Sequence, residues 1–239
     1  MLNVETLSYA FLIGFVPILI WLAFWLLQDT RHPEPRKLIV RAFVVGIVAV
    51  LLVLPVQQFT ATLLPTGFVL IVVWAFAEEA IKLLVAWFAV LRHKAVNEPI
   101  DLPIYLITVA LGFAAFENTL SEGKELQNGE LVTSIVTRNL RFIGASLIHV
   151  LSSAVIGGAL AFAFFKQWPT KILYGLIGVI LASLLHALFN FSIISFSADL
   201  LVTIFAGVWV GIVFLLLILE KIKLLKRPAW WEQMFVSKK

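Results

Sequence analysis

The stretch GFVLIVVWAFAEEAIKLLVAWFAVL, residues 67–91, sets the frame for the whole chain. It is apolar over about 25 residues, and at about 1.5 Å per helical residue it can cross a hydrocarbon core of about 30 Å. It nevertheless holds Glu78, Glu79 and Lys82 near its middle. Insertion scales put the cost of each such charge at roughly 2.5–3.5 kcal/mol. These side chains therefore need buried partners or a chemical use.

The composition is that of an integral membrane protein. Of 239 residues, 62% are hydrophobic and 13% charged, against about 45–50% and about 25% in soluble proteins. Apolar runs follow one another with short connections, so we expect an all-α, polytopic protein with a single transmembrane domain over residues 1–239. The chain has no Cys, which excludes disulfides and a thiol nucleophile. The expected surroundings are the lipid bilayer, and we expect no nucleic-acid partner.

Seven apolar runs have the length of a transmembrane helix. We expect helices at residues 7–27, 38–59, 67–91, 102–120, 139–165, 170–195 and 198–219. Most of the 18 basic residues lie after the first, third and fifth runs or in the C-terminal tail. Because cytoplasmic segments collect Lys and Arg, the N-terminus is predicted outside and the C-terminus inside. Residues 220–239, with Trp230, Trp231 and Phe235 among basic residues, are predicted to form a cytoplasmic interfacial tail.

The ionisable residues at membrane depth gather in the third to sixth runs. Besides the charges of residues 67–91, these runs hold Glu117 and Asn118, then Arg138, Arg141 and His149, then His186 and Asn190. At about 1.5 Å per residue, the adjacent glutamates lie about 17 Å, and the two histidines about 14–15 Å, below the outer ends of their helices. Glu117 is shallower unless its helix continues to residue 123. We therefore predict one polar site in the outer half of the bilayer, built by a four-helix catalytic core.

Spacing within the helices predicts how some of these side chains pair. Glu78 and Lys82 are four residues apart and share a helix face, so we expect them to form an ion pair. Glu79 points about 100° away. His186 and Asn190 have the same four-residue spacing, so an imidazole and an amide project together. Such an arrangement suits acid–base work on water and hydrogen bonding to a developing oxyanion. Two His with one or two Glu are also an adequate ligand set for Zn²⁺.

Four motifs on successive helices resemble those of the PrsW-type intramembrane proteases. They are EEAIK at 78–82, FAAFEN at 113–118, the single His149 of the next helix, and HALFN at 186–190. The connection DTRHPEP at 29–35 is similar to that family too. The family forms a wider group with the CAAX-processing prenyl-protein proteases and the APH-1 scaffold subunit of gamma-secretase. This chain has EExxK instead of EExxxR, and Glu117 instead of a His, which argues against prenyl-protein processing.

The resemblance implies an intramembrane endopeptidase in a bacterial-type cell membrane. Its substrate is expected to be a membrane-anchored protein such as an anti-sigma factor, cut on its extracytoplasmic side. The expected catalytic residues are Glu78, Glu79, Glu117, His149, His186 and Asn190, with Lys82, Asn118, Arg138 and Arg141 in support. If zinc is bound, the expected ligands are Glu79, Glu117, His149 and His186. Either a zinc-dependent or a metal-free glutamate reaction fits, and either adjacent glutamate can activate water.

Two other functions use the same buried polar residues. Carboxylates and histidines at membrane depth also serve as proton relays, so a proton-coupled transporter is one alternative. The other is a non-catalytic scaffold like APH-1, in which the polar residues only hold helices together.

Overall fold

The computed structural model describes residues 4–27, 33–127, 135–195 and 198–229. Over these residues the chain forms seven α-helices and no strand, which confirms the expected all-α architecture. The helices are α1 (Val4–Leu26), α2 (Arg36–Leu63), α3 (Phe68–Ala86), α4 (Asp101–Gln127), α5 (Ile135–Phe162), α6 (Trp168–Ser195) and α7 (Ala198–Lys223). A π-helical turn, η1 (Trp87–Leu91), continues α3.

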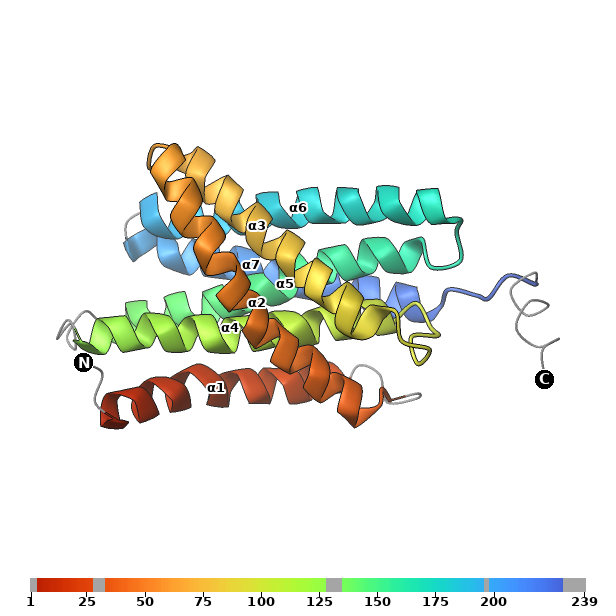
Figure 1. Ribbon diagram of the computed structural model, residues 1–239, viewed down its shortest axis with the longest axis horizontal. Coiled ribbons are helices and arrows are strands. Elements are labelled where there is room, and N and C mark those ends of the chain that lie inside the picture. Colours follow the sequence, from red (N-terminus) through yellow and green to blue (C-terminus); the bar gives the residue numbers. More distant parts are fainter. Residues whose placement is uncertain (1–3, 28–32, 128–134, 196–197, 230–239) are drawn as a thin grey trace.

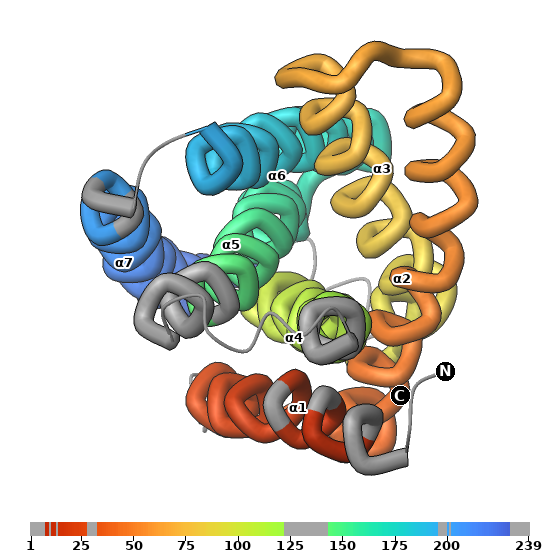
Figure 2. Tube along the Cα trace, turned by 90° about the vertical axis from the view of Figure 1, so that its left-hand side faces the viewer, coloured from red at the N-terminus to blue at the C-terminus, as the bar shows by residue number. Residues whose placement is uncertain are grey.

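Helix α4 lies at the centre of the bundle. It packs against α1, α2 and α5, while α5 in turn packs against α6 and α7. Helix α3 packs mainly against α2 and α6. Figure 1 shows α2 and α3 running obliquely across the other helices, and Figure 2 shows α4 enclosed between α1, α2 and α5. The four helices expected to carry the site, α3 to α6, are thus in contact, because α4 packs on α5, α5 on α6 and α6 on α3.

Two glycines allow α2 and α4 to cross closely. A Cβ at Gly112 of α4 would overlap the carbonyl oxygen of Phe43 in α2, and a Cβ at Gly46 of α2 would overlap that of Val109 in α4. Small residues let helix backbones approach in a membrane, where the gain comes from packing rather than from water exclusion. The crossing therefore fixes how α2 sits on the central helix.

Gly112→Ala is expected to destabilise the fold by roughly 1–3 kcal/mol, because the added methyl group has to push α2 away from α4. The matched control is Gly207→Ala in α7, where a Cβ would meet no atom within 4 Å. The measurement is the midpoint of unfolding in detergent for both variants. Equal midpoints for the two alanine variants would contradict the proposed crossing.

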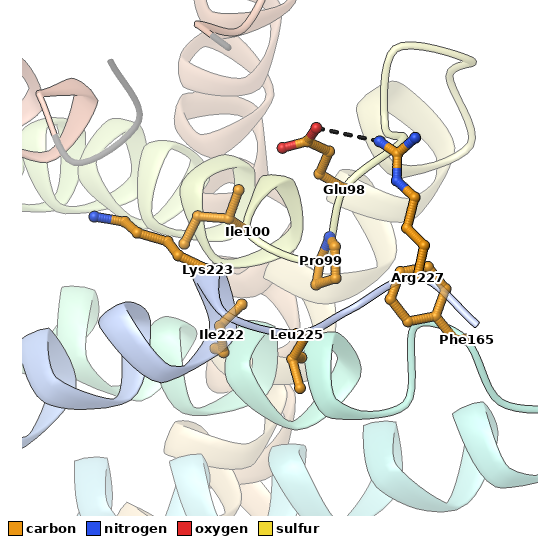
Figure 3. A pocket seen from close by; sticks show the side chains of 8 residues that line it. All are labelled: Glu98, Pro99, Ile100, Phe165, Ile222, Lys223, Leu225 and Arg227. Atoms are coloured by element: carbon orange, nitrogen blue, oxygen red, sulfur yellow. Dashed lines mark hydrogen bonds and ion pairs between the residues drawn. The ribbon is translucent and has the colours of Figure 1, made fainter. Parts of the chain in front are cut away.

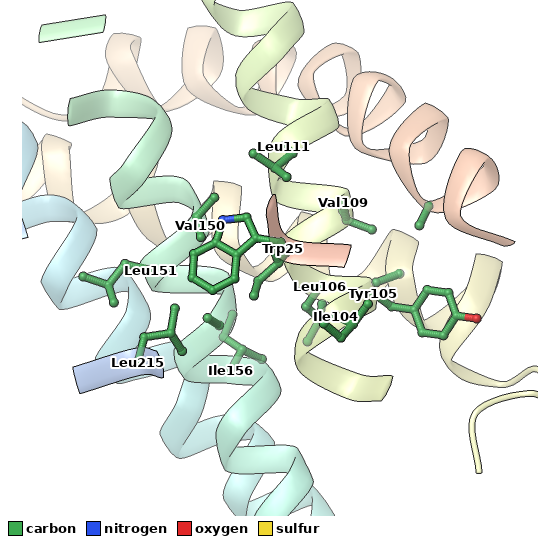
Figure 4. Close-up of a cluster of buried hydrophobic side chains, with 14 of the residues drawn as sticks. Trp25, Ile104, Tyr105, Leu106, Val109, Leu111, Val150, Leu151, Ile156 and Leu215 are labelled. Carbon is green, nitrogen blue, oxygen red and sulfur yellow. The ribbon is translucent and has the colours of Figure 1, made fainter. Parts of the chain in front are cut away.

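The apolar core surrounds α4 and α5. Trp25 of α1 is fully buried, and Figure 4 shows its indole near Leu111 and Val150. At one end of α4 the hydroxyl of Tyr105 donates to the carboxylate of Glu34, in the connection before α2. This contact fastens the end of the first connection to the central helix.

The outer surface of the bundle is apolar, as a lipid-facing surface has to be. On α6 the exposed face carries large hydrophobic side chains, and the opposite face carries small residues and His186. The members of the exposed face are Ile172, Leu173, Leu176, Ile177, Ile180, Leu181, Leu184 and Leu188. This is the reverse of a soluble amphipathic helix, whose outer face is polar. The chain is therefore a membrane protein.

Within the described residues, five helices are long and apolar enough to cross a membrane: α2, α4, α5, α6 and α7. Helix α1 contributes a shorter apolar stretch, Gly14–Leu26. Helix α3 carries the three charged residues of the motif at 78–82 within its 19 residues. The N-out, C-in orientation stays a prediction.

Four expected helix ends are wrong by four residues or more, among them the end of α2, which is Leu63 rather than residue 59, and the start of α5, which is Ile135 rather than residue 139. Helix α4 continues to Gln127 rather than ending at residue 120, and α7 continues to Lys223 rather than 219. Both extensions are mostly polar, SEGKELQ in α4 and EKIK in α7, and their Glu, Lys and Gln residues are good helix formers, so each helix continues beyond its apolar part. The predicted tail thus starts inside α7. Its aromatic residues Trp230, Trp231 and Phe235 lie outside the described residues.

Candidate active site

Helix α3 turns its two adjacent glutamates toward different neighbours. Successive residues on an α-helix are about 100° apart. Glu78 faces α2, where Gln57 Nε2 donates to its Oε1 over 2.8 Å. Glu79 faces α5 and α6, where His186 Nδ1 lies 2.9 Å from its Oε1 and Ser153 Oγ donates to its Oε2 over 3.3 Å. Both carboxylates are buried, with side-chain exposures of 5% and 0%.

The predicted pairing of Lys82 with Glu78 is wrong. Lys82 Nζ donates to Glu79 Oε1 over 2.6 Å, an i,i+3 pair, and both side chains are fully buried. A spacing of three or of four residues places the partner on the same helix face. Contacts with neighbouring helices therefore decide which glutamate pairs with Lys82. Lys82 Nζ also lies 3.1 Å from His149 Nδ1 of α5 and 4.8 Å from the centre of the Phe113 ring. These contacts draw the ammonium group to the side on which Glu79 lies.

His149 connects this buried ion pair to Glu117. Its Nε2 lies 2.7 Å from Glu117 Oε2. An ammonium group only donates hydrogen bonds, so His149 Nδ1 accepts from Lys82, and the proton on Nε2 is donated to Glu117. Because α4 continues past residue 120, Glu117 lies well inside its helix. With a side-chain exposure of 40%, Glu117 is the half-exposed member of an otherwise buried cluster.

A gap with two acceptors facing each other lies between Glu78 and His186. Glu79 is a carboxylate held by Lys82, so His186 Nδ1 carries the proton that is donated to it, and His186 Nε2 is left with a lone pair. That nitrogen lies 3.7 Å from Glu78 Oε2. Glu78 Oε2 is buried and has no hydrogen-bond partner among the described residues. A buried acceptor without a donor is costly, so this is the place in the cluster where a water molecule or a cation is needed.

The cluster fits a zinc ion. Glu78, His149 and His186 each offer one ligand atom, and these atoms lie within 4.8 Å of one another. Two imidazoles and one carboxylate are a known catalytic zinc set that leaves one position open. The N–H of the other ring nitrogen of His186, Nδ1, donates to the carboxylate of Glu79, as metal-bound histidines usually do. His149 can offer Nε2 to a cation only as the other neutral tautomer, with the ring proton on Nδ1, and its present hydrogen bonds with Glu117 and Lys82 are then lost.

The candidate ligand group differs from the expected set Glu79, Glu117, His149 and His186 in two respects, the first of which is that Glu117 is not a member. Glu79 is occupied by Lys82, His186 and Ser153, and the neighbouring Glu78 takes its place beside the two histidines.

The other expected site residues have different surroundings. Asn118 Nδ2 donates to Ser146 Oγ over 3.0 Å and so joins α4 to α5 beside the cluster. Asn190 is half-buried one turn beyond His186, and it has no hydrogen bond to another described residue. The side chains of Arg138 and Arg141 lie outside the described residues.

Two contacts of the cluster could not be assigned from the motifs. Gln57 belongs to α2, outside the four expected helices, and its only signal is an amide pair, Gln57 and Gln58, in an apolar run after Pro55. Ser153 lies four residues beyond His149 and so shares its helix face. Small polar residues are common in membrane helix contacts, which hides such a role.

A separate pocket shares no residue with this cluster. It lies where the segment after α7 meets the connection between η1 and α4, and Figure 3 shows Arg227 reaching Glu98 across it. Arg227 Nη2 donates to Glu98 Oε1 over 3.2 Å. Both groups are thereby paired with each other, and the pocket offers none of the carboxylate–imidazole chemistry of the cluster.

The fold and the cluster together define a helical membrane protein with a buried carboxylate–histidine centre suited to hydrolysis. Residues 34–218 match the family model described as PrsW family intramembrane metalloprotease, so the chain belongs to this family. It is an intramembrane protease by class. All residues of the cluster lie inside the matched range.

Three curated relatives are each named Protease PrsW. The protein of Geobacillus kaustophilus is 32% identical over 150 residues, covering 60% of this chain and 62% of the relative, or less than two thirds of its length. That of Bacillus subtilis is 26% identical over 187 residues, covering 77% and 82%. That of Clostridioides difficile is 29% identical over 192 residues, covering 76% and 77%. No solved structure matches the chain.

Proposed function

We propose that this protein cleaves a peptide bond of a membrane-anchored protein, using water placed between Glu78 and His186. One observation carries the proposal: the buried Glu78 Oε2, which has no hydrogen-bond partner among the described residues, lies 3.7 Å from His186 Nε2. The carboxylate and imidazole are held in place by Gln57 and Glu79, so the gap between them is preorganised. Preorganised groups aimed at a reacting atom are the usual source of enzymatic rate enhancement.

Glu78, His149 and His186 would hold a zinc ion at this gap. A bound Zn²⁺ would supply Lewis-acid activation of water and of the peptide carbonyl. Glu117 is partly exposed and next to His149, so we assign it the transfer of a proton from the attacking water to the leaving amine. Glu79 orients His186, and Lys82 neutralises Glu79. Asn190, one turn beyond His186, is the proposed hydrogen-bond donor to the oxyanion.

The substrate and its location follow from the charge pattern and from the family. We propose a single-span protein of the anti-sigma-factor kind, cut in the outer half of a bacterial plasma membrane. The distribution of basic residues, which predicts a C-terminus inside the cell, supports this side of the membrane. Family membership favours proteolysis over the transporter and scaffold alternatives. The gap between Glu78 and His186 favours it too, because neither alternative requires a site that polarises water.

The test uses membrane proteins taken from cells that lack this protein. These proteins, solubilised in detergent, are incubated with the purified wild-type chain or with Glu78→Gln, and new N-termini are identified by mass spectrometry. The wild type is expected to produce a few cuts near the ends of transmembrane segments, and the variant none. Proton-coupled uptake into proteoliposomes without any cut would support the transporter instead.

Removal of metal is expected to abolish cleavage. Treatment with 1,10-phenanthroline should lower the cleavage rate at least about 100-fold, because the chelator removes the ion that activates water. Added Zn²⁺ should restore the rate, since the three ligands can bind about one ion per chain again. The non-chelating isomer 1,7-phenanthroline is the control. Full activity of a protein shown by metal analysis to be free of zinc would contradict the metal assignment and leave the metal-free glutamate reaction.

A further inference from the structure

We propose that Gln57 of α2 is a positioning residue that fixes which oxygen of Glu78 faces the reaction. This inference rests on the proposed function and adds a fifth helix to the site. Gln57 is half-buried, and its Nε2 donates to Glu78 Oε1 over 2.8 Å. The partner oxygen, Glu78 Oε2, is the one that faces His186 Nε2.

The physical reason lies in the freedom of a carboxylate. The last torsion of a Glu side chain is broad and roughly two-fold, unlike the three staggered wells of the inner torsions. A hydrogen bond to one oxygen removes that freedom and so orients the other. Among the described residues, Glu78 accepts a hydrogen bond from Gln57 alone, and its Oε2 has no hydrogen-bond partner. Glu79, in contrast, is held by three donors.

The contrast with Glu79 makes the dependence on Gln57 specific. Loss of one donor from Glu79 leaves two others in place, whereas loss of the Gln57 amide leaves both Glu78 oxygens without a fixed direction. Groups that orient a metal ligand or a catalytic carboxylate typically contribute 10–100-fold in metal affinity or activity.

A second hydrogen bond between α2 and α3 provides a control for a purely structural role of Gln57. One turn further along α2, Thr60 Oγ1 accepts a hydrogen bond of 3.1 Å from Trp74 Nε1 of α3. This second polar contact joins α2 to α3 without touching Glu78. Trp74→Phe removes it and reports what a lost α2–α3 hydrogen bond does by itself. Gln58 is exposed on the same helix, so Gln58→Met controls for the change of residue type.

The experiment compares Gln57→Met, Gln58→Met and Trp74→Phe with the wild type. Methionine keeps the length of the side chain and removes the donor. Gln57→Met is expected to lower kcat by about 10–100-fold with little change in KM, and to weaken equilibrium Zn²⁺ binding, measured against a chromophoric chelator, by a similar factor. The two controls are expected to stay within about two-fold of the wild type on both readouts.

Two results would overturn the positioning role. One is a Gln57→Met protein whose kcat and Zn²⁺ affinity equal those of Gln58→Met. The other is an equal loss in Gln57→Met and Trp74→Phe, which would make the contact structural. A wild type that cleaves without zinc leaves kcat as the deciding measurement. A wild type that neither cleaves nor binds zinc would instead reject the proposed function itself, and this role with it.

Discussion

Glu78→Gln is expected to lower kcat/KM for peptide cleavage by about 10²–10⁴-fold, because a carboxylate is replaced by an amide at the gap that holds water. Glutamine keeps the shape of the side chain and can still meet Gln57. Unlike a carboxylate, it adds no charge that has to be neutralised in the buried cluster, so the fold is expected to persist. The measurement combines cleavage rates with the unfolding midpoint of the same preparation in detergent.

The control for Glu78→Gln is Glu220→Gln. Glu220 lies on α7, is largely exposed and pairs with Lys223, so it makes the same chemical change far from the cluster. Surface pairs of this kind contribute about 0–1 kcal/mol, and cleavage by this variant should equal that of the wild type. Cleavage by Glu78→Gln at the wild-type rate would overturn the assignment of Glu78.

Lys82→Met is expected to destabilise the protein by about 3–5 kcal/mol, the usual cost of leaving one charge of a buried pair without its partner. Lys82 and Glu79 are both fully buried and 2.6 Å apart, so no solvent can replace the missing ammonium group. The variant also removes the donor to His149 Nδ1, and cleavage should be lost with stability. The free energy of unfolding is measured by titration with a denaturing detergent.

The double variant Glu79→Gln with Lys82→Met separates charge from packing. Both charges are then absent, and most of the lost stability should return, because replacing both members of a buried pair is often neutral. Activity should not return, since His186 loses its carboxylate partner. A double variant as unstable as Lys82→Met alone would show that the charge of Glu79 is not the cause.

The fold could be predicted closely from the sequence because its signals are local. Apolar runs of membrane length set seven helices, and most ends agree with the structure to within a few residues. The end of α4 could not be found in this way, since SEGKELQ reads as a loop by polarity and yet extends the helix. Hydrophobic patterning marks where the bilayer ends, and a helix is free to project beyond it.

The site could be predicted in its members and less well in its contacts. The depth of the ionisable residues along their helices predicted that Glu78, Glu79, Glu117, His149 and His186 lie close together. In the structure they form one cluster of contacts, which also includes Lys82. The partner of Lys82 and the role of Gln57 depend on how α2 and α5 pack against α3, which no spacing within a single helix contains. In a low-dielectric interior such tertiary contacts outweigh the small preferences of i,i+3 and i,i+4 pairs.

The adjacency of Glu78 and Glu79 makes the rotation of one helix decisive. Since one glutamate is anchored on α2 and the other on α5 and α6, α3 has a single angular setting in which both sets of contacts form. One residue inserted between Phe68 and Glu78 turns everything beyond it by about 100° and removes both sets together. A twist of α3 therefore cannot be confined to one of the two glutamates, and the centre forms or fails as one unit.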